Sequence, residues 1–155
     1  MKKISLVKVE INEENINLFI LIQNSVANSK TFRMGYVTKE KALERFNEAE
    51  VLFIKEGDII VGTLEYQLGT NDYAYLKSIA IMPEFQGKGI GRQSLLLLLS
   101  NHLKFISKIG LNTHPENTAL GLYQSMGFVV EKKIPRNKLL GYEPSLFLTL
   151  KKELR

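Results

Sequence analysis

A glycine-rich segment in the middle of the chain, Gln86-Gly87-Lys88-Gly89-Ile90-Gly91 followed by Arg92, has the residue types of an anion-binding loop. Apolar residues at helical spacing follow it, so the segment is expected to lead into the N-terminus of a helix. The first amides of a helix have no intrahelical partner and carry partial positive charge, which attracts phosphate. Glycines let the backbone approach phosphate oxygens, and Lys88 and Arg92 add formal charge. The segment predicts a phosphate site; the alternative is a strand-to-helix turn that binds nothing.

Two common nucleotide-binding motifs do not fit this segment. The loop of P-loop NTPases requires Gly-x-x-x-x-Gly-Lys-Ser/Thr, and the trailing Gly-Lys-Ser/Thr is absent here. A dinucleotide-binding loop requires Gly-x-Gly-x-x-Gly at the start of a βαβ unit, whereas this segment reads Gly87-x-Gly89-x-Gly91 and follows a predicted antiparallel meander. Spacing and context therefore exclude both nucleotide-binding motifs.

The elements that must position the loop can be predicted from hydrophobic periodicity. Strands are expected at residues 2–10, 51–55, 59–68, 73–82, 111–113, 128–133 and 146–152. Helices are expected after the capping residues Asn12 and Thr38, the second with Leu43 and Phe46 facing inward. A long helix is expected from Gly89 to about residue 108, closed by Gly110, and another over residues 118–126. This order predicts an α/β sheet with helices on both faces.

The strand at residues 73–82 contains a break in its alternation. Ala74 and Leu76 set one inward phase, and Ile79 resumes in the opposite phase. A slip of one residue in a period-two pattern predicts a β-bulge near Lys77-Ser78. The alternative is a strand that is buried on both faces, where alternation has little meaning.

Two segments of this chain can be compared with a known family. Residues Ile81-Met82-Pro83-Glu84-Phe85-Gln86-Gly87-Lys88-Gly89-Ile90-Gly91 match Gln/Arg-x-x-Gly-x-Gly/Ala after a strand that ends in hydrophobic-x-Pro. Residues Ala119-Leu120-Gly121-Leu122-Tyr123-Gln124-Ser125-Met126-Gly127-Phe128 match Ala-x-x-Leu-Tyr-x-x-x-Gly-Phe. In this order, the two segments resemble the acyl-CoA loop and a later helix of the GNAT superfamily of N-acyltransferases. The resemblance implies one domain, residues 1–155, with a mixed, mostly antiparallel sheet of about seven strands, helices on both faces and a splay between the fourth and fifth strands.

The resemblance also implies an activity, the transfer of the acetyl group of acetyl-CoA to a primary amine by direct attack in a ternary complex. The sequence has no cysteine that could relay the acetyl group covalently. The pantetheine arm of the co-substrate would lie in the splayed sheet, and the backbone amide of Ile79 would polarise the thioester carbonyl. The expected cofactor-binding residues are Ile79, Ala80, Ile81, Gln86, Gly87, Lys88, Gly89, Ile90, Gly91, Arg92, Asn117 and Tyr123.

Proton transfer is the least defined part of the implied site. Tyr123 falls on the general-acid tyrosine of the family, although it could instead pack its helix onto the sheet. Many members carry a glutamate on the bulged strand as general base, and the matching position here is Tyr75. The proton could then be accepted by Glu65, Asp72, Tyr75 or a water chain. Of these, Glu65 is taken as the candidate base. The missing glutamate also motivates an alternative function, a non-catalytic acyl-CoA-binding sensor of the same fold.

Three further positions carry alternatives. The asparagine of the family's pattern is replaced by Glu116, and the next residue, Asn117, could bind pantetheine or cap the following helix. His114, beside Pro115, is interpreted as a surface or turn residue rather than a base. Acceptor contacts in this fold would come from residues 24–46 and 136–144, which include the aromatic residues Phe32, Tyr36 and Tyr142.

Composition and charge limit the remaining function classes. The chain has 155 residues, 45% hydrophobic and 24% charged, which suits one globular domain. The net charge is +5, but the basic residues are scattered and form no basic helix with interleaved aromatic residues, so no nucleic-acid partner is expected. The one cluster, Lys132, Lys133, Arg136 and Lys138, is expected to form a solvated hairpin face; the alternative is contact with an acidic acceptor or the CoA 3′-phosphate. No apolar run could span a membrane and no signal segment is evident, so a cytoplasmic monomer or homodimer without a metal is expected.

Overall fold

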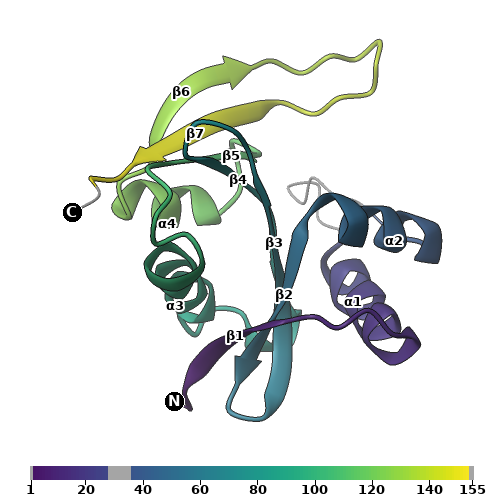
Figure 1. The fold of residues 1–155 in the computed structure, drawn as a ribbon. Helices are drawn as coiled ribbons and strands as arrows, with labels where there is room; N and C mark the ends of the chain where they lie inside the picture. Colours follow the sequence, from purple (N-terminus) through teal and green to yellow (C-terminus); the bar gives the residue numbers. More distant parts are fainter. Residues whose placement is uncertain (1, 28–35, 154–155) are drawn as a thin grey trace.

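Seven strands form one mixed sheet in the computed structural model, which describes residues 2–27 and 36–153 (Figure 1). The strand order is β1-β2-β3-β4-β5-β7-β6, and the pair β4–β5 is parallel while the other neighbours are antiparallel. The strands are β1 (Ile4–Lys8), β2 (Glu50–Glu56), β3 (Ile59–Leu68), β4 (Tyr73–Ile81), β5 (Lys108–Thr113), β6 (Val129–Ile134) and β7 (Ser145–Lys151). The predicted sheet is therefore confirmed.

Helices cover both faces of this sheet (Figure 1). On one face lie α1 (Glu13–Val26) and α2 (Lys39–Glu48), and on the other lie α3 (Ile90–Leu97) and α4 (Ala119–Ser125). The predicted caps are present: Asn12 Oδ1 accepts from the Asn15 amide at 2.9 Å, and Thr38 Oγ1 accepts from the Lys41 amide at 3.3 Å. Each face has its own hydrophobic core, the larger one under α3 and α4. In the described part of the chain, no helix is both long and apolar enough to cross a membrane.

The predicted bulge lies in β4 at Lys77. Ser78 pairs with Glu65 and Leu76 pairs with the next residue of β3, so Lys77 is the extra residue. The bulge places Leu76 and Ile79 in the same core, under α3 and α4, while Ala80 faces the other core. This change of face explains the broken alternation in the sequence.

The sheet splays after this bulge. Pairing between β4 and β5 runs from Tyr73–Lys108 to Leu76–Leu111 and stops there. Beyond these pairs β4 continues to Ile81 without β5 as a neighbour, while β5 stays paired with β7. The expected separation between the fourth and fifth strands is therefore present.

The helix after the glycine loop is shorter than predicted. A π-helical turn, η2 (Leu98–His102), follows α3, and the strand β5 already begins at Lys108. The side-chain amine of Lys152 donates to the carbonyls of Leu99 at 3.0 Å and Leu103 at 2.6 Å, which satisfies the helix end. A contact with the last residues of the chain therefore ends the helix, and local periodicity carries no signal of it.

Gly110 does not cap this helix as predicted but lies within β5. A Cβ atom at Gly110 would lie 2.2 Å from the hydroxyl oxygen of Tyr73. The glycine is therefore required because the Tyr73 ring crosses the strand at this position.

The rotation of α2 also differs from the prediction. Leu43 was expected inside but is 38% exposed, whereas Arg45 is buried against Glu65 of β3. Phe46 is partly buried, with its ring 5.0 Å from that of Phe19, as expected. The buried carboxylate explains the rotation, since the arginine satisfies it by turning inward.

The β6–β7 hairpin extends beyond the body of the sheet (Figure 1). Lys132, Lys133, Arg136 and Lys138 on it are exposed, as predicted, and Arg136 pairs with Glu143 at 2.9 Å.

Candidate functional site

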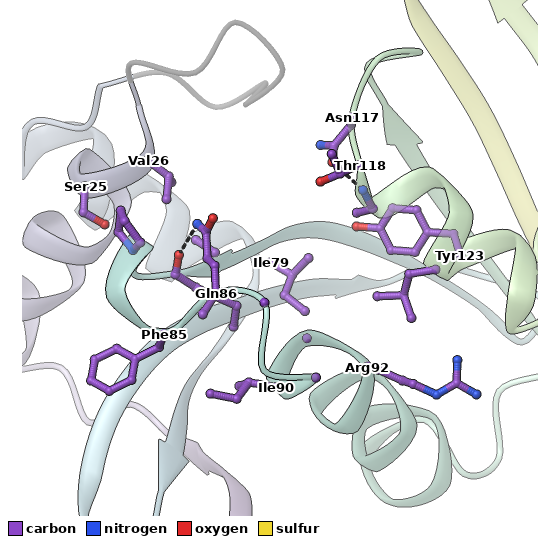
Figure 2. Close-up of a pocket in the computed structure, with 18 of the residues that line it drawn as sticks. Ser25, Val26, Ile79, Phe85, Gln86, Ile90, Arg92, Asn117, Thr118 and Tyr123 are labelled. Carbon is purple, nitrogen blue, oxygen red and sulfur yellow. Dashed lines mark hydrogen bonds between the residues drawn. The ribbon is translucent and has the colours of Figure 1, made fainter.

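A cavity of about 780 Å³ lies beside the part of β4 that has left β5 (Figure 2). One wall is the end of β4, Ile79 to Ile81, and the floor is the glycine loop with the start of α3. The opposite wall is the segment from Glu116 to Ala119 together with Leu122 and Tyr123 of α4. The cavity therefore joins the predicted phosphate loop to the splayed strands.

The glycine loop leaves space for a ligand. Gly87 and Gly89 have φ angles of +75° and +79°, and a Cβ atom at either would meet nothing within 4 Å. Gly89 occupies the N-cap position of α3, where it has no side chain that could accept from the first amides. The first helical hydrogen bond runs from the Gln93 amide to the Gly89 carbonyl, at 3.1 Å. The amides of residues 90–92 thus have no partner within the helix. This arrangement suits a diphosphate, which accepts hydrogen bonds from backbone amides.

Three polar side chains surround the loop. Gln86 Nε2 donates to the Ile81 carbonyl at 2.8 Å and fixes the loop against the end of β4 (Figure 2). Arg92 lines the cavity and its Nη1 donates to Ser125 Oγ at 3.2 Å. Lys88 is not among the lining residues; its amine lies 5.5 Å from the centre of the Phe85 ring. Of the expected cofactor-binding residues, all except Lys88 line the cavity.

Tyr123 contributes a hydroxyl group from α4. The side chain is 6% exposed and its ring packs against Phe128, with centroids 5.9 Å apart. Figure 2 shows the phenol directed into the cavity. Burial raises the pKa of Tyr123 to about 12, so the hydroxyl stays protonated at neutral pH and can donate a hydrogen bond.

The turn before α4 places three polar residues next to each other. His114 is 3% exposed, so the prediction of a surface residue is wrong, but it does form the turn: its carbonyl accepts from the Asn117 amide at 3.0 Å. The Glu116 amide donates to His114 Nδ1 at 3.1 Å. Asn117 Oδ1 accepts from the Ala119 amide at 2.8 Å, a bond to the first turn of α4 that fits the second of its two predicted roles. Glu116 and Asn117 both line the cavity as well.

Glu65 lies outside the cavity, on the face of the sheet that α2 covers. Its side chain is fully buried and accepts from Arg45 Nε at 2.8 Å and from Arg45 Nη2. Arg45 also donates to Gln23 Oε1 at 2.9 Å, and Gln23 Nε2 donates to Thr63 Oγ1 at 2.7 Å. These bonds join α1, α2 and β3, which makes the Glu65 carboxylate part of a buried ion pair that holds the helices.

The other proton-acceptor candidates also lie outside the cavity lining. Asp72 is in the turn before β4, where its carbonyl accepts from the amides of residues 107 and 108. The Tyr75 hydroxyl donates to Asn112 Oδ1 at 2.7 Å. Tyr36 and Tyr142 are exposed at 57% and 65%, and Phe32 lies outside the described residues.

Sequence reasoning missed several residues of the cavity wall. Pro83, Phe85 and Leu122 belong to the two motif segments and could have been found from them. Ser25 and Val26 come from the end of α1, far from the loop in sequence, and no local pattern indicates them. Among the described residues, no group of three or more His, Asp or Glu side chains could hold a metal ion.

Comparisons with known proteins found a matching family model and solved structures of similar fold. A family model described as an acetyltransferase (GNAT) domain matches residues 7–138. No match was found among curated protein sequences. A Bacillus subtilis acetyltransferase in complex with CoA is 19% identical, with a TM-score of 0.75, covering 97% of this chain and 100% of that one. An Elizabethkingia anophelis GNAT acetyltransferase with acetyl-CoA bound is 21% identical, with a TM-score of 0.72, covering 96% and 98%.

A third similar structure is that of an enzyme whose acceptor is specified. An acetyl transferase from Salmonella typhimurium that modifies the N-terminal serine of a 50S ribosomal subunit protein is 18% identical, with a TM-score of 0.78, covering 97% of this chain and 95% of that one. At these identities the three structures support the fold.

Proposed function

Since this chain belongs to the GNAT acetyltransferase family, we propose that it transfers the acetyl group of acetyl-CoA to a primary amine by direct attack in a ternary complex. The observation that carries this proposal is the glycine loop at the start of α3: its residues line the cavity in the splayed sheet, and no side chain caps the helix there. Residues 1–155 would act as a single domain.

The co-substrate would be held largely by the backbone. The amides of Gly87 to Arg92 would bind the diphosphate, and the open space at Gly87 and Gly89 supports this because no side chain competes for it. Lys88 and Arg92 would add positive charge beside the loop. Backbone groups of Ile79 to Ile81 would pair with pantetheine, since β4 lacks a strand neighbour on that side. The Asn117 side chain, which lines the cavity, would contact pantetheine from the opposite wall.

The chemistry would need two groups near the thioester. The Ile79 amide would stabilise negative charge on the thioester oxygen as the amine attacks, an effect typically worth about 3–4 kcal/mol. The Tyr123 hydroxyl would donate to the departing sulfur. A pKa of about 12 lies above the ~8.5 of a thiol, so the phenol would stabilise the thiolate by hydrogen bonding rather than by giving up its proton fully. Because the sequence contains no cysteine, no acyl-cysteine intermediate is involved.

The test is acetyl-CoA-dependent release of CoA over a panel of primary amines, with acetyl-CoA binding measured separately by calorimetry. Binding together with turnover of at least one amine supports the proposal. Binding without turnover on the whole panel would favour a non-catalytic acyl-CoA sensor. Absence of binding would overturn the assignment of the glycine loop.

A further inference from the structure

The connection from β5 to α4 consists of two linked turns that are built in the same way. In the first, His114 Nδ1 accepts from the Glu116 amide at 3.1 Å, and the His114 carbonyl accepts from the Asn117 amide at 3.0 Å. In the second, Asn117 Oδ1 accepts from the Ala119 amide at 2.8 Å, and the Asn117 carbonyl accepts from the Leu120 amide at 3.0 Å. We call residues 114–120 the double turn.

His114 makes a bond in this turn that asparagine usually makes. Asparagine side chains accept from the backbone amide two residues on and thereby shape a turn. The Nδ1 atom of histidine lies one bond beyond Cγ, as the Oδ1 atom of asparagine does, and it can accept in the same way. Pro115 follows at the second position of the turn, where its fixed φ is favourable. His114 is thus a turn-forming residue that directly follows β5.

The acceptor role determines which nitrogen of the imidazole carries the proton. A neutral imidazole has one N–H and one lone pair, so an accepting Nδ1 places the proton on Nε2. The Glu116 carboxylate lies 4.0 Å from Nδ1, and an unprotonated Nδ1 has no proton to donate to it. His114 is 3% exposed, and its Nε2 is buried without a hydrogen-bond partner in the part of the chain that the structure describes.

This unpartnered Nε2 indicates that packing alone does not explain the imidazole. A buried donor without a partner destabilises a fold, because its bonds to water are lost and not replaced. A leucine would fill a similar space and would bring no such donor. The feature that a leucine lacks is the acceptor for the Glu116 amide. The specific contribution of His114 is therefore the shape of the double turn.

The double turn forms the cavity wall that lies opposite the end of β4. Residues 116–119 line the cavity, and His114 is not among the lining residues (Figure 2). Thr113 is still paired with Leu146 of β7, so the chain turns from the sheet into the wall at His114. His114 therefore acts on the cavity only through the residues that follow it.

Tyr123, the other functional group on this side of the cavity, is held by separate contacts. Its carbonyl accepts from the Phe128 amide at 3.0 Å, and the two rings pack with centroids 5.9 Å apart. The first turn of α4 has its own bond to Asn117 Oδ1. A change at His114 is therefore expected to move the wall more than it moves the phenol.

We propose that His114 is a positioning residue for acetyl-CoA, which holds the wall beside the pantetheine arm through the Glu116 amide without touching the ligand. This inference rests on the proposed acetyl transfer, in which pantetheine lies between this wall and the part of β4 that has left β5. Loss of the Nδ1 acceptor breaks the bond to the Glu116 amide and lets the wall move. Tyr123 keeps its own contacts, so the loss should fall on co-substrate binding rather than on the chemical step.

The first experiment measures the stability of two variants. His114→Leu removes the buried Nε2 donor together with the bond to the Glu116 amide, two opposing effects, so the midpoint of thermal unfolding should stay within about 2 °C of the wild type. His114→Asn keeps an acceptor at the same place but leaves a cavity where the outer ring atoms were. Its midpoint should fall by about 2–8 °C.

The affinity for acetyl-CoA should change in the opposite order. Calorimetric titration, at a temperature where both variants are folded, should show Kd raised about 3- to 10-fold in His114→Leu and close to the wild-type value in His114→Asn. For an amine that the wild type acetylates, kcat should change less than about 3-fold in either variant. Rescue of binding by the less stable variant is a result that a packing role does not produce.

Three outcomes would overturn the inference. An unchanged Kd in His114→Leu would show that the bond to the Glu116 amide does not position the wall. A Kd that follows stability, weaker in His114→Asn than in His114→Leu, would make His114 a packing residue. If His114→Leu is the less stable variant, the bond supports the whole fold. Absence of acetyl-CoA binding to the wild-type chain would instead overturn the proposed function, and the inference with it.

Thr113→Val is the matched control. Thr113 precedes His114, is 3% exposed, and has a buried hydroxyl without a hydrogen-bond partner among the described residues. Valine has nearly the same shape and removes this hydroxyl, so Kd should be unchanged and the unfolding midpoint no lower. A rise in Kd as large as that in His114→Leu would show that any substitution at the end of β5 disturbs the wall, which would refute a specific role for the imidazole.

Two further measurements locate the effect. Adenosine diphosphate carries the diphosphate but no pantetheine, so its Kd, measured by competition with acetyl-CoA, should be the same in His114→Leu and the wild type. An equal loss of affinity for both ligands would contradict an effect on the pantetheine wall. NMR of the imidazole nitrogens should show the proton of His114 on Nε2, and a proton on Nδ1 would exclude the acceptor role and overturn the inference.

Discussion

Replacing Gly89 by alanine should separate the ligand-binding role of the glycine loop from its effect on folding. Gly89 has φ +79°, and an added Cβ would point into space that opens on the cavity. An L-residue in this left-handed conformation costs about 1–2 kcal/mol, so the variant should be less stable by that amount. If the chain shifts to relieve the strain, the amides of residues 90–92 at the start of α3 move as well.

Gly141 provides a matched control for this substitution. It has φ +72° and a Cβ there would also meet nothing within 4 Å, but it lies in the β6–β7 hairpin away from the cavity. Gly141→Ala should therefore lose a similar 1–2 kcal/mol of folding free energy, about as estimated for Gly89→Ala, and keep acetyl-CoA affinity.

The expected loss of affinity can be estimated from the bonds at risk. A hydrogen bond to a charged group contributes about 1.5–3 kcal/mol, so loss of one amide contact to the diphosphate weakens binding about 10- to 100-fold. Calorimetric titration with acetyl-CoA gives the affinity, and denaturant unfolding gives the stability. If Gly89→Ala binds acetyl-CoA as tightly as Gly141→Ala does, the loop does not bind the diphosphate.

The remaining predictions concern one phenol, one ion pair and one helix. Tyr123→Phe should lower kcat at least ~10-fold with little change in acetyl-CoA affinity; an unchanged kcat in steady-state assays would make Tyr123 structural. Burial raises the pKa of Tyr123 to about 12, so the unfolded phenol ionises first as the pH rises. Tyr123 should therefore lower the unfolding free energy by about 1.4 kcal/mol per pH unit between pH 10 and 12, and urea titrations of Tyr123→Phe should lack this contribution. Glu65→Leu alone should lower the unfolding free energy by about 3–5 kcal/mol, because it leaves Arg45 buried and unpaired. The double variant Arg45→Met with Glu65→Leu should recover most of this stability and keep its activity. A double variant that is stable but inactive would indicate that Glu65 is the base after all. Gly121→Ala in α4 should raise the unfolding free energy by about 0.5–1 kcal/mol, since the added methyl meets nothing within 4 Å, and a drop in stability would contradict this packing.

Local sequence patterns were sufficient for the parts of the fold that short-range physics determines. The bulge at Lys77 could be predicted because a slip in alternation is visible over a few residues of one strand. The caps at Asn12 and Thr38 and the glycine loop could be predicted for the same reason, since each depends on neighbouring residues alone. These elements include the floor of the cavity and one of its walls.

The errors all involve contacts between segments that are distant in sequence. The inward turn of Arg45 depends on Glu65, which lies on another element. The early end of the helix that follows the glycine loop depends on Lys152, near the end of the chain. The neighbours of His114 in the sequence do not indicate its burial, because the proline beside it indicates only the turn. A single sequence does not show such pairings, so it cannot predict them.

The most direct test of the account is a crystal structure of the chain grown with acetyl-CoA. We expect the diphosphate within hydrogen-bond distance of the amides between Gly87 and Arg92, pantetheine alongside Ile79 to Ile81, and the sulfur near the Tyr123 hydroxyl. Acetyl-CoA bound elsewhere while these amides point into solvent would contradict the account.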